Sequence, residues 1–146
     1  MGGRPAPDPY SERTAIRGLV FVSLPAYGFL GKAPAFPFAE DSDVDRKLEL
    51  KLWRELWKSP QACGWIDQPW RWHTLAEYCR ISTVIRVNPV ASLVAQLHRY
   101  RDQLGLTPSG LRDNLWTIDY SRSVPPGDEP VAPPVVQRRR SRDFQG

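Results

Sequence analysis

The sequence predicts an all-α protein with a small helical core of about five helices, and three observations support this fold class. Only four of the 15 prolines lie in residues 41–120, so this stretch contains few of the residues that most often interrupt a helix. Apolar residues recur there every three or four positions, which places them on one face of a helix. The stretch also contains Ser-Pro, Asn-Pro and Thr-Pro pairs, which are typical of helix starts because a capping side chain precedes proline.

The helices of this core domain should follow one another with short connections. We expect them to cover about residues 43–58, 60–66, 70–86, 89–105 and 108–118. The first should start at a cap among residues 41–43, and the fourth should end at Gly105, a typical C-terminal glycine. Residues 82–85 are rich in β-branched side chains, so a strand is the alternative at the end of the third helix.

Residues 1–40 are predicted to form a flexible leader followed by an extended arm rich in proline and aromatic residues. Residues 19–38 are apolar and aromatic, but three prolines and two glycines interrupt them, which excludes a regular helix and disfavours a long strand. The aromatic side chains favour an arm that packs over the core or over a neighbouring subunit. Disorder of this segment is the alternative.

Residues 121–146 are predicted to form a disordered tail, because a segment this rich in proline and arginine buries too little apolar surface to offset its ordering entropy. Its basic cluster consists of Arg138, Arg139, Arg140 and Arg142. The whole chain carries 20 Lys and Arg against 16 Asp and Glu, a net charge of +4. This charge permits an acidic partner such as nucleic acid but does not require one.

No motif for catalysis, metal binding or membrane insertion stands out. The longest apolar stretch falls well short of the roughly 20 residues that a spanning helix needs, and the N-terminus lacks a signal-peptide pattern, so we expect neither a membrane partner nor export. We expect the two cysteines to be reduced and to form no disulfide. The cysteines and histidines also lack the close pairs of a zinc site; they are Cys63, His73, Cys79 and His98. Phosphate-binding loops and nucleophile elbows are also missing, so we expect no enzyme activity, catalytic residue, cofactor or metal.

The first predicted helix carries a narrow basic stripe that is a candidate for DNA contact. On a helical wheel, four basic side chains fall within a stripe about 60° wide, whereas leucine and tryptophan occupy much of the remainder. These basic residues are Lys47, Lys51, Arg54 and Lys58. Clustered lysine and arginine suit DNA phosphates, but a solvated helix face is the alternative interpretation. The arginine cluster of the tail is the second candidate for DNA contact.

The fourth predicted helix carries an apolar stripe that is a candidate for oligomerisation. Its members recur at alternate spacings of three and four residues, as in helices packed side by side; they are Val90, Leu93, Leu97, Tyr100 and Leu104. Two heptads are too few for a free-standing coiled coil, but they suffice for a seam between subunits. A core face within one chain is the alternative.

Six tryptophans are many for this length, and five of them fall within residues 53–72. Exposed aromatic side chains can stack on single-stranded nucleic acid. Trp53 and Trp57, however, lie on the apolar face of the first predicted helix, which favours burial in the core.

Four segments of the chain resemble the small subunit of actinobacterial phage terminases. They are LPAYGFLGKAPAFPF (24–38), LWRELWKSPQACGWI (52–66), WHTLAEYCR (72–80) and QLGLTPSGLRDNLWTI (103–118). Their order and spacing match as well, so the resemblance covers about residues 20–120. The LW-x-x-LW-x-SPQA and LGLTP runs are its most specific parts.

The resemblance implies a non-catalytic protein of the bacterial host cytoplasm that acts in viral genome packaging. It would bind viral double-stranded DNA, assemble into homo-oligomeric rings through helical contacts, and recruit or regulate the large subunit, which holds the ATPase and the nuclease. Two other classes remain open. A helix-turn-helix regulator would use the second and third helices to enter a major groove, and would bind as a dimer. A structural or scaffold virion protein would bind no DNA.

Overall fold

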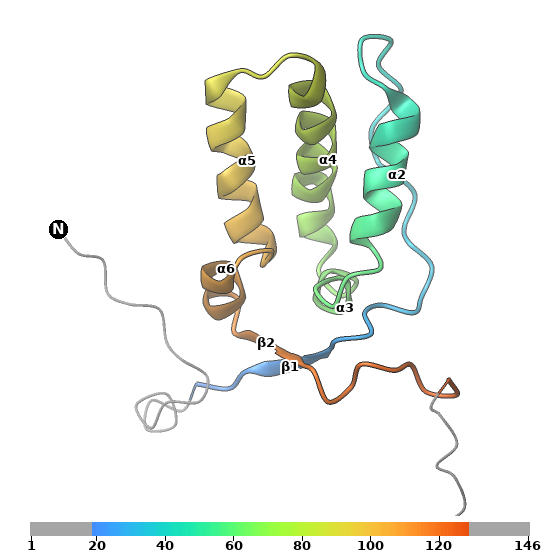
Figure 1. The fold of residues 1–146 in the computed structure, drawn as a ribbon, viewed down its shortest axis with the longest axis vertical. Coiled ribbons are helices and arrows are strands. Elements are labelled where there is room, and N and C mark those ends of the chain that lie inside the picture. The colour runs from blue at the N-terminus through green and yellow to red at the C-terminus, as the bar shows by residue number, and fades with distance from the viewer. Residues whose placement is uncertain (1–18, 129–146) are drawn as a thin grey trace, which may run out of the picture.

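The computed structural model describes residues 19–128, and residues 1–18 and 129–146 lie outside this description. The described chain is mostly helical, as the sequence predicts, but two short strands correct the expectation of helices alone (Figure 1). In chain order the elements are β1 (Val22–Pro25), α2 (Arg46–Leu56), α3 (Ala62–Trp65), the 3-10 helix η1 (Pro69–Arg71), α4 (Trp72–Val87), α5 (Ala91–Leu104), α6 (Pro108–Asp113) and β2 (Trp116–Asp119).

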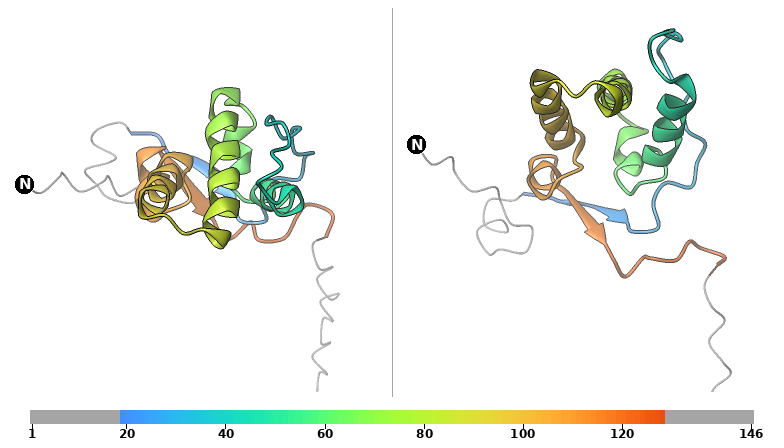
Figure 2. Two further views of the ribbon diagram at one scale, coloured as in Figure 1. Left: turned by 90° about the horizontal axis from the view of Figure 1, so that it is seen from above. Right: turned by 45° about the horizontal axis from the view of Figure 1, so that its top comes forward.

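Three helices, α2, α4 and α5, lie side by side in one layer, with α4 in the middle (Figures 1 and 2). α4 packs against both of its neighbours. The short helices α3 and α6 lie at one end of this layer, next to the strands (Figure 1). β1 and β2 form a two-stranded parallel sheet, in which Val22 is opposite Trp116 and Pro25 is opposite Asp119. The sheet therefore joins the first and last described elements at the same end of the layer.

Only one of the three capping-residue and proline pairs starts a helix as predicted. At α6, the hydroxyl of Thr107 accepts a hydrogen bond from the Gly110 N–H at 3.0 Å, and Pro108 occupies the first turn. α3 and α5 begin instead after Gln61 and Val90, and neither of these residues caps its helix through a side-chain hydrogen bond. Tertiary packing, rather than a local cap, therefore fixes the starts of α3 and α5.

The other helix ends agree more closely with the sequence prediction. Asp45 caps α2, in place of the predicted residues 41–43, because its carboxylate accepts a hydrogen bond from the Leu48 N–H at 3.1 Å. α4 runs without a break through the β-branched residues 82–85, which confirms the helical prediction there. α5 ends at Gly105, which has a left-handed φ of 77°, as predicted.

The fifth predicted helix is wrong in its second half. α6 ends at Asp113, and residues 116–119 form β2 rather than continuing as a helix to Ile118. Leu115 has a φ of 57°, a left-handed conformation that interrupts the helix. The aromatic and β-branched residues that follow suit a strand, and β1 supplies the pairing partner from the far end of the described chain.

The side chain of Trp116 lies in a slot between two glycines, and this burial explains why the chain changes direction there. Trp116 is only 5% exposed. A Cβ atom on Gly64 would lie 2.5 Å from its ring, and one on Gly105 would lie 2.7 Å from it. The guanidinium group of Arg71 lies 5.1 Å from the ring centroid, in a cation–π contact. Any side chain at either glycine would therefore displace the tryptophan.

Tryptophan side chains form the centre of the core. The ring of Trp57 makes edge-to-face contacts with Trp53, Trp65 and Trp72, at centroid distances of 5.6 to 5.9 Å. Trp53 and Trp57 are each 2% exposed, which confirms their predicted place in the core. Their faces are therefore not free to stack on the bases of a nucleic acid.

The arm, residues 26–40, packs on the core of its own chain and runs along α2 (Figure 1). The ring of Phe36 contacts that of Trp53 edge to face at 5.2 Å. The indole N–H of Trp53 donates a hydrogen bond to the carbonyl oxygen of Pro34 at 2.8 Å. The structure thus places this segment over the core of its own chain, which is one of the two arrangements that the sequence analysis leaves open.

A buried carboxylate, that of Glu49 on α2, fastens the arm to two helices. Glu49 is 0% exposed and accepts hydrogen bonds from Arg46 at 3.0 Å and from Arg80 of α4 at 2.8 Å. The same two guanidinium groups donate to arm carbonyls, Arg46 to Phe38 at 3.0 Å and Arg80 to Ala39 at 2.7 Å. The hydrogen bond to Glu49 also raises the pKa of Arg80.

The substitution Glu49→Gln should lower the free energy of unfolding by about 3 kcal/mol, because it removes one member of a buried ionic cluster and leaves two arginines without their counter-charge. The arginines keep about a quarter of their side-chain surface exposed, and this limits the loss. Urea denaturation followed by circular dichroism measures the change.

Glu55→Gln is the matched control, because Glu55 is an exposed acid on the same helix and lies 4.0 Å from Lys51. Its substitution should change the free energy of unfolding by less than about 1 kcal/mol. Equal effects of the two substitutions would contradict the structural role of Glu49.

Candidate nucleic-acid interface

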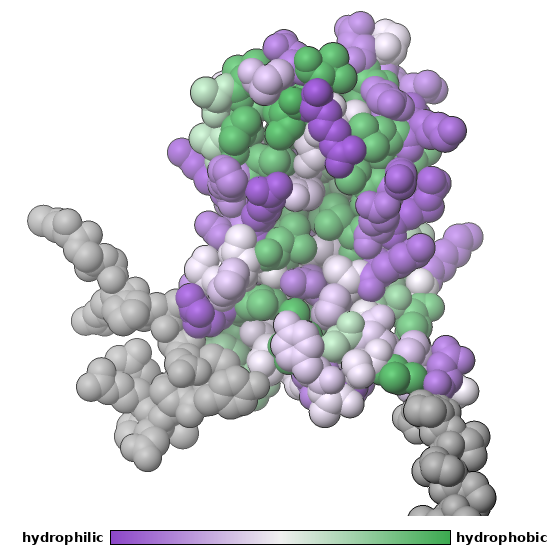
Figure 3. All heavy atoms as spheres, viewed as in Figure 1, coloured by the Kyte–Doolittle hydropathy of each residue, from purple (hydrophilic) through white to green (hydrophobic). Residues whose placement is uncertain are grey.

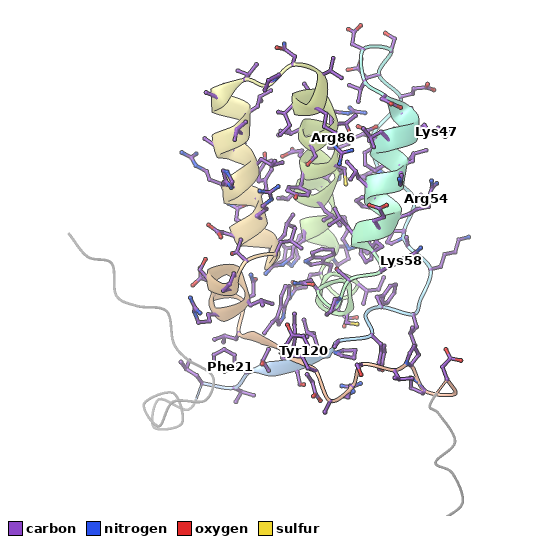
Figure 4. All side chains as sticks on the ribbon, in the orientation of Figure 1. Phe21, Lys47, Arg54, Lys58, Arg86 and Tyr120 are labelled. Carbon is purple, nitrogen blue, oxygen red and sulfur yellow. The ribbon has the colours of Figure 1, made fainter. Side chains whose placement is uncertain are left out.

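The four basic residues predicted for DNA contact form one exposed row along α2 and the turn that follows it, which we call the basic ridge. Its members are Lys47, Lys51, Arg54 and Lys58, all of them exposed. Figure 4 shows Lys47, Arg54 and Lys58 on the side of α2 that faces away from α4, and hydrophilic residues gather along this edge in Figure 3. Lys51 lies 4.0 Å from the carboxylate of Glu55, and no ion pair with a described residue involves the other three. The structure therefore brings the helical part of the predicted site together.

The spacing of the basic ridge suits a row of phosphates. Successive members are three or four residues apart, which corresponds to about 4.5–6 Å along the helix axis. A DNA strand presents one phosphate per roughly 3.4 Å of duplex axis, so several members can approach phosphates at the same time. Such contacts would hold and orient a protein on DNA but would not read its sequence.

The second predicted DNA site lies outside the described residues. It consists of Arg138, Arg139, Arg140 and Arg142, all within residues 129–146. The structure therefore does not place the tail arginines relative to the basic ridge.

Lys32 of the arm is a cation beside the ridge that the sequence analysis missed. It is exposed and lines a groove between the arm and α2, together with Arg54 and Lys58. The pattern of α2 contains no signal for Lys32, because its position depends on the path of the arm. Only the contacts that fasten the arm bring the three cations to one place.

The position of α4 disfavours a helix-turn-helix site. A recognition helix needs one open face to enter the major groove, but α4 is flanked by α2 and α5 (Figure 2). Its buried residues are Leu75, Ala76, Cys79 and Thr83. α3, the other helix of such a unit, has only four residues. Both helices contribute buried residues to the core, and a helix-turn-helix site on them stays a prediction.

The apolar stripe predicted for oligomerisation lies on α5, and most of it packs within the chain. Along the helix, Val90 is exposed, Leu93 and Tyr100 are partly buried, and Leu97 and Leu104 are buried. The Tyr100 hydroxyl donates a hydrogen bond to Glu77 of α4 at 2.6 Å, and this bond raises the pKa of Tyr100. The buried members thus belong to the core of one chain, and only the end near Val90 stays open to a neighbour. Oligomerisation through this stripe stays a prediction.

One tryptophan offers an exposed ring on the described surface. Trp70 is 70% exposed, and the guanidinium group of Arg71 lies 4.4 Å from its ring centroid. The ring already has a cation over it, so base stacking here would have to displace Arg71 or use the opposite face.

Within residues 19–128, no group of three or more His, Cys, Asp and Glu side chains could hold a metal ion. Burial raises the pKa of the Cys63 thiol, and burial together with the nearby Glu49 carboxylate raises that of Cys79 to about 12. Over the same residues, no helix has the length and apolar character needed to cross a membrane.

Comparison of the chain with models of protein families, with curated protein sequences and with solved structures finds no match in any of the three. A functional assignment therefore depends on the geometry described above and on the sequence resemblance.

Leu97→Ala should lower the free energy of unfolding by about 2–4 kcal/mol, because it removes a buried side chain from the contact between α4 and α5. Val90→Ala, at the exposed end of the same stripe, should change it by less than about 0.5 kcal/mol. Urea denaturation at two protein concentrations measures both values. A loss for Leu97→Ala that depends on protein concentration would contradict its burial within one chain.

In a Cys63→Ser variant, the remaining thiol of Cys79 should react with a disulfide reagent at pH 8 only after unfolding. The raised pKa of Cys79 leaves very little reactive thiolate at this pH, and burial blocks access to it. Absorbance measurements in native buffer and in urea compare the two rates. Rapid reaction in native buffer would contradict the packing of α4.

Proposed function

We propose that the chain is a non-catalytic, DNA-binding assembly protein of the terminase small-subunit type, acting in the host cytoplasm during packaging of a bacteriophage genome. The basic ridge is the observation that carries this proposal. Its members lie in one exposed row along α2 and the turn after it, and most of them lack an ion-pair partner among the described residues. The resemblance of residues 20–120 to terminase small subunits suggests that the DNA is viral double-stranded DNA and that the second partner is the terminase large subunit.

The ridge supports binding of a duplex through its phosphates. Lysine and arginine that neutralise phosphates release counterions, so this binding should weaken strongly as the salt concentration rises. Sequence preference would then need further contacts, because phosphate contacts carry no sequence information directly. The tail arginines are the second source of such electrostatic contacts.

Lys47→Ala and Lys51→Ala should each weaken binding to a DNA duplex. Each should also reduce the slope of log affinity against log salt concentration by about 0.9, because one phosphate contact and its counterion release are lost. Fluorescence anisotropy of a labelled duplex over a series of salt concentrations measures both quantities.

Arg99→Ala is the matched control, since it removes an exposed charge from α5, at the opposite edge of the layer. It should leave the salt slope unchanged. Equal slopes for the wild type and both ridge variants would contradict the proposed DNA site. Deletion of residues 137–146 tests the tail separately, and an unchanged affinity and slope would show that the ridge acts without it.

A further inference from the structure

The groove between the arm and α2, which we call the arm groove, has an apolar floor and a cationic rim. It has a volume of about 360 Å³, and its floor includes Phe36 and the edges of Trp53 and Trp57. Lys32, Arg54 and Lys58 stand around it; all three are exposed, and no ion pair within residues 19–128 involves them. Figure 4 shows Arg54 near the end of α2 and Lys58 just beyond it.

The charge of the arm groove distinguishes it from two other grooves of the described chain. The groove beside Arg71 includes the carboxylates of Asp102 and Asp113, and the groove between α2 and α5 includes that of Glu55. None of the described residues that line the arm groove is acidic. Its rim therefore favours an anionic guest.

The two core tryptophans that line the arm groove differ in their hydrogen bonding. Trp57, which lines the groove, is 2% exposed, and its indole N–H has no hydrogen-bond partner within the described chain. The equivalent N–H of Trp53 donates to the Pro34 carbonyl of the arm. The unpaired N–H of Trp57 is buried, so we infer a guest from the charged rim and the apolar floor of the groove and not from this donor.

The same chain carries an acidic segment of complementary charge. Residues 40–45, which we call the acidic loop, read Glu-Asp-Ser-Asp-Val-Asp and lie just before α2. All are exposed except Val44, which is partly exposed. No ion pair with a described residue involves Glu40, Asp41 or Asp43. The loop therefore combines exposed carboxylates, at least three of them without an ion pair to a described residue, with one apolar side chain of a size that the arm groove can take.

The acidic loop of a chain lies apart from the cations of its own arm groove, because the loop precedes α2 whereas Arg54 and Lys58 lie near the other end of the helix and just beyond it. The acidic loop precedes the first turn of α2, and Lys58 follows its last turn (Figures 1 and 4). Eleven helical residues separate them by roughly 16 Å along the axis. The terminal segments are poor guests as well, because residues 1–18 and 129–146 each carry more basic than acidic side chains.

We propose that the acidic loop of one copy docks into the arm groove of the next copy. Carboxylates of the loop then pair with Lys32, Arg54 and Lys58, and Val44 enters the apolar groove. The contact joins two different surfaces of identical chains, so it is head-to-tail, and repetition of such a contact gives a ring when its rotation closes. This inference rests on the assembly part of the proposed function and names the surfaces that perform it.

Charge reversal tests the contact in the full chain and without DNA. The groove variant Lys32→Glu/Lys58→Glu and the loop variant Glu40→Lys/Asp43→Lys should each raise the dissociation constant for self-association by about 10-fold or more at low salt. A chain that carries all four substitutions has an acidic groove and a basic loop, so it should recover most of the association. Sedimentation velocity over a range of protein concentrations measures each value.

The control is Arg99→Glu, which reverses an exposed charge on α5 and should leave association unchanged. A monomeric wild-type chain would overturn the proposal. The groove would then be expected to bind an acidic segment of another protein. Unchanged association of either double variant, or failure of the four substitutions to restore it, would also overturn the proposal. DNA binding by the Lys47 and Lys51 variants is a separate measurement, so its failure is distinguishable from failure of this contact.

Discussion

The structure depends on the neutralisation of one buried charge, the carboxylate of Glu49. An ionised side chain with 0% exposure is tolerated only where charged partners and hydrogen bonds surround it, and Arg46 and Arg80 supply both. Each of these arginines also donates to a carbonyl of the arm and lies over an arm phenylalanine ring, at 4.9 Å and 5.0 Å. The arrangement that satisfies Glu49 therefore fixes the arm against α2 and α4 at the same time.

The path of the arm then determines the charged surface. At Gly28, which has a φ of 87°, the arm passes so close to the turn after α2 that a Cβ atom would lie 1.9 Å from the carbonyl oxygen of Lys58. This approach brings Lys32 beside Arg54 and Lys58. Two of the ridge cations thus border the arm groove, so DNA and the acidic loop of a neighbour would compete for them. The remaining ridge cations, near Lys47, would stay open to DNA in an assembled state.

Local signals in the sequence predict that the helices exist and where some of them end, but they do not predict features that depend on non-local contacts, such as the starts of α3 and α5. The Thr107 cap, the Gly105 end of α5 and the basic face of α2 all follow from residues close together in the chain. β2 could not be predicted in this way, because its partner β1 lies at the other end of the described chain and Trp116 is held by a slot that forms only in the fold. The position of Lys32 could not be predicted either, because it depends on the path of the arm. The arm is held by the cluster around Glu49, and the sequence gives no sign that this acid is buried.

The mass of the full chain in solution, measured by sedimentation with and without a DNA duplex, tests the central claim most directly. A DNA-binding assembly protein should form a species larger than a dimer and should take up the duplex at low salt. A dimer that binds a short palindrome would instead indicate a regulator of the helix-turn-helix class. A species that takes up no DNA at any salt concentration would contradict the account.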